Sequence, residues 1–230
     1  MPIFTAVIPA AGSGVRMKSS MPKQYLPLCG IPVLAHTLRA FDGHERCVEI
    51  VIATSDRRVL SEMLAAYPCS TPVRVVDGGA RRQDSVFAAV NACPDDDSIL
   101  LIHDAARPLI SREEISAVLE AMLEYDAALL AVPVTDTIKM VHEEFVVSTP
   151  DRRTLWIAQT PQAARAGQFR KAFRAAASDD ATVTDDAAAL EHIGVRVAVV
   201  RGSGTNMKIT TEADLAVAES ILRRSLNSES

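Results

Sequence analysis

The chain has 230 residues, of which 48 % are hydrophobic, so it is long enough to bury the core of one large α/β domain. Its formal net charge of −5 comes from well-mixed acids and bases, which argues against general attraction to nucleic acid or to an anionic membrane. No apolar run approaches the roughly 20 residues that span a bilayer, and no secretory signal pattern is present, so we expect a cytoplasmic protein. The four cysteines and five histidines lack the close spacing typical of a zinc site.

Short apolar, β-branched segments alternate with helical patterns along the chain. The first helical pattern follows Pro32, and another follows Ser111, which forms a capping-box pattern with Glu114. A C-terminal helix is predicted over 213–222. The predicted strands are 3–8, 48–53, 73–76, 99–103, 127–134 and 195–200. We therefore expect a single domain over residues 1–230, of the α/β class, with a Rossmann-like, mostly parallel sheet and helices on both faces.

Residues 135–155 interrupt this alternation. They have no helical period and contain two short β-like pieces, 137–141 and 145–147. We interpret the segment as a projecting β-arm. An arm without a core of its own usually packs on a partner, which favours a homodimer, and a solvated hairpin is the alternative.

The segment from Pro9 to Leu28 follows the first predicted strand and contains two glycines and three cations but no acid. Met17 stands where a dinucleotide-binding fingerprint, and equally a phosphate loop, requires a glycine. The first predicted helix also begins too late for its N-terminus to receive a phosphate at the glycines. The loop is better suited to wrapping a polyphosphate with backbone amides and cations, and a solvated loop without a ligand is the alternative.

Eight blocks of sequence carry a family likeness. In chain order they read PAAGSGVRM, PKQYLPL, VDGGARRQDSV, HDAARP, PVTDTIK, LWIAQTPQ, ATVTDDAAALE and NMKIT, and they extend from residue 9 to 210. Together they resemble the 2-C-methyl-D-erythritol 4-phosphate cytidylyltransferase family, which belongs to the nucleotidylyltransferases that act on sugar phosphates. The resemblance implies transfer of CMP from CTP to methylerythritol 4-phosphate, with Mg²⁺, in the non-mevalonate isoprenoid pathway. It also implies a homodimer.

The resemblance further implies three groups of site residues. The catalytic cations around the reacting phosphates are Arg16, Lys23 and Lys208. The nucleotide-binding residues are Ala10, Ala11, Gly12, Gly14, Gly79, Arg82, Ser85 and Asp104, and Asp104 is also the implied Mg²⁺ ligand. The residues for the polyol phosphate are Thr137, Arg152, Thr160, Thr184 and Asp185. No general base is required, because the attacking phosphate is already an anion, and catalysis rests on positioning and charge stabilisation.

Structural alternatives stand beside several of these roles. Asp104 could pair with Arg107 within its loop, Arg82 could lie on a helix surface, and Asp185 could cap a helix. Ala80 and Arg81 occupy positions where members of the family can carry an acid, which puts any carboxylate contact to the nucleotide from there in doubt.

Two other functions remain open at this point. A ribitol 5-phosphate cytidylyltransferase would share the loop and the CTP side, although DTIK and LWIAQTPQ resemble the methylerythritol branch more closely. A non-catalytic nucleotide-binding protein could share the fold. Such a protein would have no need of cations at the reacting phosphates.

Overall fold

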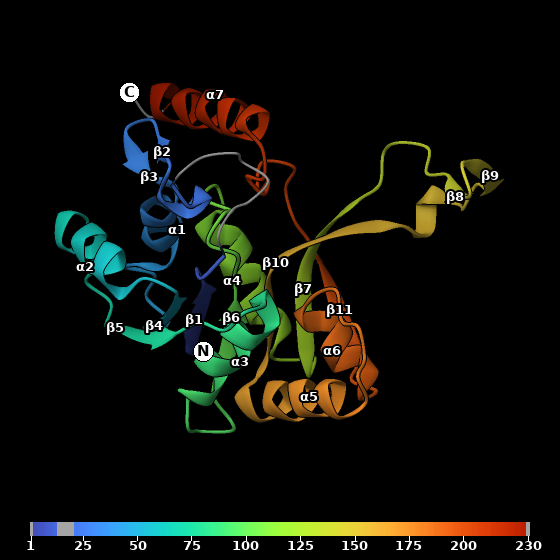
Figure 1. Cartoon of the computed structure of the whole chain (residues 1–230), viewed down its shortest axis with the longest axis horizontal. Coiled ribbons are helices and arrows are strands. Elements are labelled where there is room, and N and C mark those ends of the chain that lie inside the picture. The colour runs from blue at the N-terminus through green and yellow to red at the C-terminus, as the bar shows by residue number, and fades with distance from the viewer. Residues whose placement is uncertain (1, 13–20, 229–230) are drawn as a thin grey trace.

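The computed structural model describes residues 2–12 and 21–228 (Figure 1). Within these residues the main sheet has seven strands in the order β11-β7-β10-β6-β1-β4-β5. β10 runs antiparallel to both of its neighbours, and the other neighbouring strands are parallel. The predicted α/β class with a mostly parallel sheet is therefore confirmed. The strands are β1 (Phe4–Pro9), β4 (Cys47–Thr54), β5 (Val73–Asp77), β6 (Ile99–Ile102), β7 (Ala127–Pro133), β10 (Trp156–Arg165) and β11 (Val197–Arg201).

Helices cover both faces of this sheet. Successive side chains of a strand point to opposite faces, so Ile8 and Val7 of β1 belong to different cores. The core around Ile8 includes Leu34, Leu60 and Leu119 from three helices, α1 (Val33–Phe41), α2 (Arg57–Ala66) and α4 (Arg112–Ala121). The core around Val7 is closed by α3 (Arg82–Asn91), α5 (Ala166–Ser178) and α6 (Asp186–His192). Apolar residues on both faces of the strands are the reason for this double cover.

Most of the predicted elements are present. The first predicted helix begins at Val33, directly after Pro32. The Ser111 hydroxyl accepts a hydrogen bond from the Glu114 amide, and the Glu114 carboxylate accepts one from the Ser111 amide, as a capping box requires. The C-terminal helix α7 (Glu212–Ser228) is longer than predicted and packs on a short hairpin of β2 (Pro27–Leu28) and β3 (Ile31–Pro32). Among the described residues, no helix has the length and apolar character needed to cross a membrane.

The sequence patterns did not predict β10. Between Ala158 and Gln162 this strand advances by four residues while β7 advances by two, from Ala131 to Leu129. The extra residues form a bulge in the middle of the sheet. Bulges re-aim side chains, and this one carries the buried polar residues Gln159 and Thr160.

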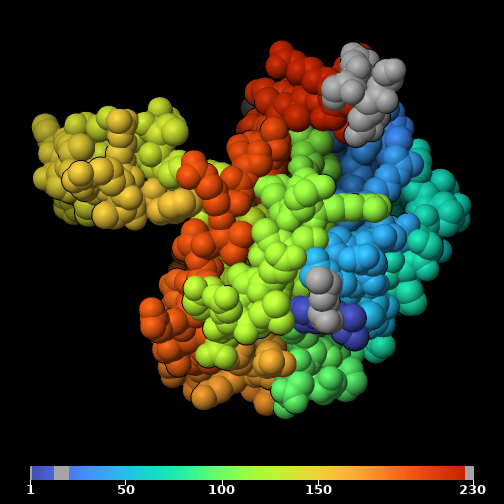
Figure 2. Space-filling view, turned by 180° about the vertical axis from the view of Figure 1, so that it is seen from behind, coloured from blue at the N-terminus to red at the C-terminus, as the bar shows by residue number. Residues whose placement is uncertain are grey.

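The segment between β7 and β10 projects from the body of the protein as an arm (Figures 1 and 2). At its end β8 (Met140–His142) and β9 (Phe145–Ser148) form an antiparallel pair, and the 3-10 turn η3 (Arg152–Thr154) leads back into β10. All residues of β8 and β9 are exposed. The predicted piece 145–147 falls on β9, and the predicted piece 137–141 overlaps β8 only at residues 140 and 141. Several of the exposed side chains are large and apolar, which soluble surfaces rarely gather in one place.

Candidate active site

A cavity of about 320 Å³ lies at the carboxyl ends of neighbouring parallel strands. The segment after β1 forms one wall, and the segment after β5, with the start of α3, forms a second. The segment after β6 forms a third wall. Lys23 and Gln24 of the 3-10 turn η2 (Lys23–Tyr25) and Lys208, which precedes α7, complete the lining. Ligands of open α/β sheets bind at this edge, where the loops after the strands converge.

The cavity brings together most of the nucleotide-site residues that the sequence predicted. Those that line it are Ala10, Ala11, Gly12, Lys23, Gly79, Arg82, Ser85, Asp104 and Lys208. Arg16 and Gly14 lie outside the described residues. Thr160 lies buried on β10, and Thr184 and Asp185 line a separate cavity of about 110 Å³ beside Arg82. Thr137 and Arg152 are exposed on the arm, where Arg152 Nη1 donates a hydrogen bond to the Thr135 carbonyl.

The loops after β1 and β5 approach each other closely at one side of the cavity. A Cβ atom on Gly78 would collide with the Cβ atom of Ala11, so only glycine fits at this position. The Ser85 hydroxyl accepts a hydrogen bond of 3.0 Å from the Gly79 amide and fixes the second loop. Small side chains on both loops leave a surface of backbone against which a planar base can lie.

Gln24 is a site residue that the sequence reasoning missed. Its side-chain amide is buried and donates hydrogen bonds of 2.7 and 3.1 Å to the carbonyls of Ala10 and Gly12. The side chain therefore fixes the start of the cationic loop against η2. A glutamine in a polar loop gives no sequence signal of this role.

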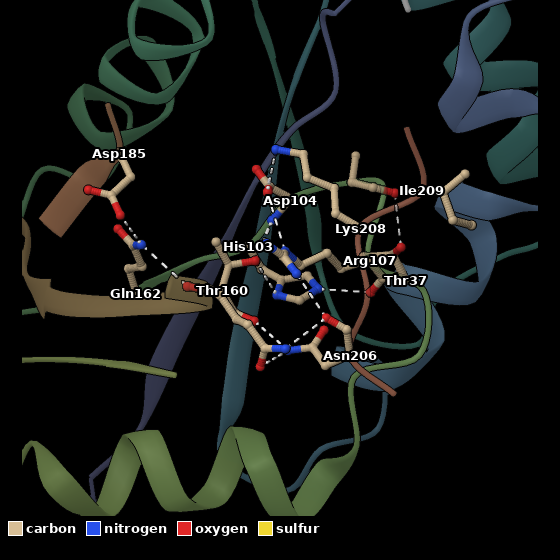
Figure 3. Close-up of polar contacts among 12 residues, drawn as sticks. Thr37, His103, Asp104, Arg107, Thr160, Gln162, Asp185, Asn206, Lys208 and Ile209 are labelled. Atoms are coloured by element: carbon tan, nitrogen blue, oxygen red, sulfur yellow. Dashed lines mark hydrogen bonds and ion pairs between the residues drawn. The ribbon is translucent and has the colours of Figure 1, made fainter. Parts of the chain in front are cut away.

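Asp104, two residues beyond β6, lines the cavity, and its carboxylate lies beside the Lys208 ammonium group (Figure 3). Among the described residues, three cations contact its carboxylate: Lys208 Nζ at 2.8 Å, Arg82 Nε at 2.9 Å and Arg107 Nε at 3.5 Å. Burial alone raises the pKa of Asp104, but the charges of Arg82, Lys208 and Arg107 outweigh it and hold the pKa well below its usual range. The carboxylate is ionised, and Arg107 is one of several partners rather than a simple loop clamp.

Arg82 joins three elements of the fold. While its Nε donates to Asp104, its two terminal nitrogens donate bonds of 2.9 and 2.7 Å to the carboxylate of Asp186, at the start of α6. Burial alone lowers the pKa of Arg82, and the two carboxylates raise it above its usual value. Arg82, with its side chain 33 % exposed, is thus a bridge between two carboxylates rather than an unpaired residue on a helix surface. Asp186 was not predicted as a site residue, although it directly follows the predicted Asp185.

Asp185 is the N-cap of α6, which confirms the alternative interpretation that this residue caps a helix. Its carboxylate accepts a bond of 2.8 Å from the Ala188 amide and another of 2.8 Å from the side chain of Gln162. One carboxylate oxygen therefore caps α6, and the other ties the start of this helix to β10. Thr184, the residue before it, is exposed.

The donor set suits a metal ion that arrives with a polyphosphate. Within the described residues, no group of three or more histidines, cysteines and acids could hold a metal by itself. Mg²⁺ takes oxygen ligands and keeps several of them from phosphates and water, so one ionised carboxylate on the cavity wall is sufficient. Asp104 fits this role, while Lys23, whose Nζ donates to the Ile209 carbonyl at 3.0 Å, and Lys208 offer positive charge beside it.

Comparison with known proteins gives one consistent result. The profile of the family described as 2-C-methyl-D-erythritol 4-phosphate cytidylyltransferase (IspD) matches residues 4–224. A protein of that name from Symbiobacterium thermophilum is 46 % identical over 219 residues, which cover 95 % of this chain and 92 % of that protein. One from Halalkalibacterium halodurans is 42 % identical over 221 residues, covering 95 % and 96 %.

Solved structures agree with the sequence matches. The 2-C-methyl-D-erythritol 4-phosphate cytidylyltransferase of Francisella tularensis superposes with a TM-score of 0.82 at 36 % identity, over 95 % of this chain and 99 % of that one. The 4-diphosphocytidyl-2C-methyl-D-erythritol synthase of Anaerococcus prevotii superposes with a TM-score of 0.84 at 29 % identity, over 96 % and 99 %. The profile match spans nearly the whole chain, and the relatives match at nearly full length. This chain therefore belongs to the 2-C-methyl-D-erythritol 4-phosphate cytidylyltransferase family.

Proposed function

We propose that this chain transfers the CMP group of CTP to 2-C-methyl-D-erythritol 4-phosphate, with Mg²⁺ and as a homodimer, releasing pyrophosphate and 4-diphosphocytidyl-2-C-methyl-D-erythritol. Membership of the family makes the chain a nucleotidyltransferase. The observation that carries the proposal is that Lys23, Lys208, Arg82 and Asp104 line one cavity at the strand ends. Lys208 and Arg82 form ion pairs with Asp104 there. A nucleotide-binding protein without catalytic activity would have no need of cations at the reacting end of the cavity.

The cavity has an end suited to a base and an end suited to phosphates. The narrow approach of the Ala10–Gly12 and Gly79–Ser85 walls supports binding of cytosine and ribose against backbone groups. Ala80 and Arg81 also line this end, and Arg81 is paired with Asp84 at 2.8 Å. Base recognition then relies on the backbone and on Ser85, without a carboxylate at positions 80 and 81.

The reacting end must hold two anions together. Each pair of unit charges about 4 Å apart repels by about 1 kcal/mol in water and by about 4 kcal/mol at an effective dielectric of 20. Lys23 and Lys208, with Arg16 of the same loop as the family motif implies, would offset this repulsion as the substrate's phosphate oxygen attacks the α-phosphorus. When bound at Asp104, Mg²⁺ supplies further positive charge and polarises the phosphoryl oxygens. No side chain has to remove a proton from the attacking phosphate.

The polyol phosphate would be bound with help from a partner subunit. Thr137 and Arg152 lie on the arm, which extends away from the body of its own chain (Figure 2). The arm also exposes Met140, Val141 and Phe145, a surface that burial against a second copy would stabilise. These features support an arm that completes the site of the other subunit, where a hydroxyl and an arginine fork suit a phosphate with neighbouring alcohols.

Pyrophosphate release from CTP tests the reaction, with methylerythritol 4-phosphate and ribitol 5-phosphate offered separately. We expect turnover with the first only, and a Lys23→Ala variant should lose about 10²–10³-fold in kcat if its charge acts on the transition state. The exposed Arg58→Ala variant is the matched control and should keep full activity. Turnover with ribitol 5-phosphate alone would establish the other cytidylyltransferase, and none with either substrate would indicate a nucleotide-binding protein.

Shared sites are tested by mixing two inactive variants, Lys23→Ala and Arg152→Ala. Heterodimers contain one site with neither change if the arm serves the partner's cavity, so we expect part of the activity to return. Arg153→Ala, next along the arm and highly exposed, is the control for Arg152→Ala. Verified heterodimers without recovered activity would contradict the shared site.

A further inference from the structure

Three segments of the active site are joined through the backbone of Ile209, the residue after Lys208 (Figure 3). The Ile209 amide donates a hydrogen bond of 2.8 Å to the carbonyl of Ala106, in the turn that follows Asp104. The Ile209 carbonyl accepts a bond of 3.0 Å from Nζ of Lys23, which comes from η2. Lys208 itself pairs with the Asp104 carboxylate at 2.8 Å. The backbone at this point therefore links both lysines to the segment that carries the acid.

The side chain of Ile209 anchors this point to the C-terminal helix. It is fully buried in a small core that is separate from the two cores of the main sheet. The same core includes Leu28 of β2 and Ala218 of α7. Ile209 thus lies between α7 and the hairpin that follows η2 (Figure 1). The orientation of its backbone depends on how α7 begins.

The peptide group between Ile209 and Thr210 is hydrogen-bonded on both of its sides. Its carbonyl oxygen accepts from the Lys23 ammonium group, and its amide, which is that of Thr210, donates to Oδ2 of Asp214 at 2.8 Å. This peptide group is trans and planar, so its C=O and N–H point in opposite directions and can turn only together. A cation on the oxygen and an anion on the amide also polarise the group in the same sense, which strengthens both bonds. Asp214 therefore acts on Lys23 through a single peptide group.

Asp214 lies in the first turn of α7 and binds the two residues before this helix. Its Oδ2 atom also accepts from the Thr210 hydroxyl at 2.6 Å and from the Thr211 amide at 2.8 Å. The Thr211 hydroxyl in turn accepts a bond of 3.2 Å from the Asp214 amide, which completes a capping box. The hydrogen bond from the Thr210 side chain is the main cause that lowers the pKa of Asp214 to about 2, so the carboxylate is ionised at any assay pH.

The bonds to Thr210 go beyond what a helix cap needs. A capping box satisfies the amide of the N-cap residue, which here is Thr211. The two further bonds from Thr210 extend the contact by one residue toward the active site and include the peptide group that binds Lys23. Lys23 and Lys208 line the same cavity and carry like charges that repel each other, so a fixed acceptor is needed to keep Lys23 in place.

We propose that Asp214 is a positioning residue for the reaction, which fixes the Ile209–Thr210 peptide group so that the Lys23 ammonium group stays bound next to Lys208 in the cavity wall. The inference rests on the role of Lys23 in the proposed function.

Kinetics of Asp214→Ala and Asp214→Asn test this role. Alanine removes the acceptor, so the displaced Lys23 should lower kcat by about tenfold while the KM for CTP changes little. Asparagine keeps one oxygen, and because all three bonds end on a single oxygen atom, kcat should stay within about threefold of wild type. Melting temperatures of both variants are measured alongside. Equal kcat for the alanine variant and wild type, or a loss that asparagine does not rescue, would overturn the proposal.

Glu212→Ala is the matched control. Glu212 is exposed in the same first turn of α7, so its replacement removes the same charge from the start of the helix. We expect an unchanged kcat for this variant. A loss as large as that of Asp214→Ala would attribute the effect to the charge at the helix terminus and would overturn the proposal.

A double-variant comparison tests whether Asp214 acts through Lys23. Adding Asp214→Ala to Lys23→Ala should lower kcat by less than about twofold, because the ammonium group that Asp214 positions is already absent. Independent effects would instead multiply and give a further loss of about tenfold. That further loss would contradict the proposal, since general loosening of α7 would lower the activity of both backgrounds alike.

Crystal structures of the ligand-free wild-type protein and of Asp214→Ala test the same contact without turnover. We expect Lys23 Nζ within about 3.2 Å of the Ile209 carbonyl oxygen in the wild type, and this bond broken in the variant. A bond that persists in the variant would refute the proposal whether or not the protein turns over CTP. Absence of turnover by a wild-type chain that has the bond, which the variant lacks, would refute the proposed function instead.

Discussion

Replacing Asp104 with asparagine should separate the metal role of this residue from its effect on the surrounding cations. The change keeps the shape and removes one negative charge, which is present at any assay pH because the cations around it hold its pKa well below the usual range. Lys208 Nζ lies 2.8 Å from the Asp104 carboxylate. A phosphate oxygen bound on the other side of this ammonium group would lie about 5–6 Å from the carboxylate.

Like charges at that separation repel by about 0.7 kcal/mol in water and by about 3 kcal/mol at an effective dielectric of 20. Since the Lys208 side chain is partly exposed, we take about 1 kcal/mol, so Asp104→Asn should bind CTP about fivefold more tightly when Mg²⁺ is absent. With Mg²⁺ present, the same variant should lose at least about 10²-fold in kcat, because it lacks the carboxylate that would hold the ion.

Titration calorimetry with CTP, in EDTA and then in Mg²⁺, measures the first effect, and pyrophosphate release measures the second. The exposed Asp126→Asn variant controls for a simple change in net charge. Weaker binding of CTP to Asp104→Asn in EDTA would show that the carboxylate organises the cations rather than repelling the nucleotide. Turnover that Mg²⁺ still stimulates to the wild-type level would refute the metal role.

Three further predictions follow from the packing and from the pKa shifts. Gly78→Ala should raise the KM for CTP about tenfold, because the new Cβ atom would push Ala11 out of the cavity wall at a cost of about 1–3 kcal/mol. Gly204→Ala is the control and should leave the KM unchanged, since a Cβ atom there meets nothing within 4 Å. Equal KM values of the two variants in steady-state assays would contradict this prediction. Because burial lowers the pKa of His103 to about 4, the unfolded chain binds one more proton than the native protein between about pH 6.5 and 4. Stability to urea should therefore fall by about 1.4 kcal/mol per pH unit on acidification through this window, in addition to the effects of other groups, and a His103→Gln variant should lack this component. Burial raises the pKa of Cys47, Cys69 and Cys93 to about 11, so their thiolate fraction at pH 8 is about a hundredfold below that of an unperturbed thiol. A disulfide reagent should modify these three slowly in the native protein and rapidly in denaturant, and fast native reaction at any of them would count against the packing around it.

The sequence predicted those parts of the fold that depend on local pattern. β1, β4 and β6 are apolar on both faces because helices cover both sides of the sheet, and that composition is readable without a structure. β10 is different, because its sequence WIAQTPQAAR mixes polar residues with a proline. It becomes a central strand only through the bulge, whose polar side chains find partners on segments distant in sequence. The hydrophobic periodicity of the sequence does not reveal those partners.

The candidate site residues also fall into those that local sequence blocks predicted and those that only tertiary contacts reveal. Residues that follow strands in recognisable blocks, such as Asp104 and Lys208, were named from the sequence because the family likeness is carried by those blocks. Gln24 and Asp186 were missed as site residues, since each acts through a tertiary contact. Asp186, for example, pairs with Arg82 across 104 positions of sequence. Only the folded chain brings such pairs together.

A crystal structure of the protein with CTP and Mg²⁺ would locate both ligands in the candidate active site. We expect cytosine between the loops after β1 and β5, the triphosphate beside Lys23 and Lys208, and the metal ion on Asp104 with phosphate oxygens completing its coordination. A nucleotide bound outside this cavity, or a metal ion held without Asp104, would contradict this expectation.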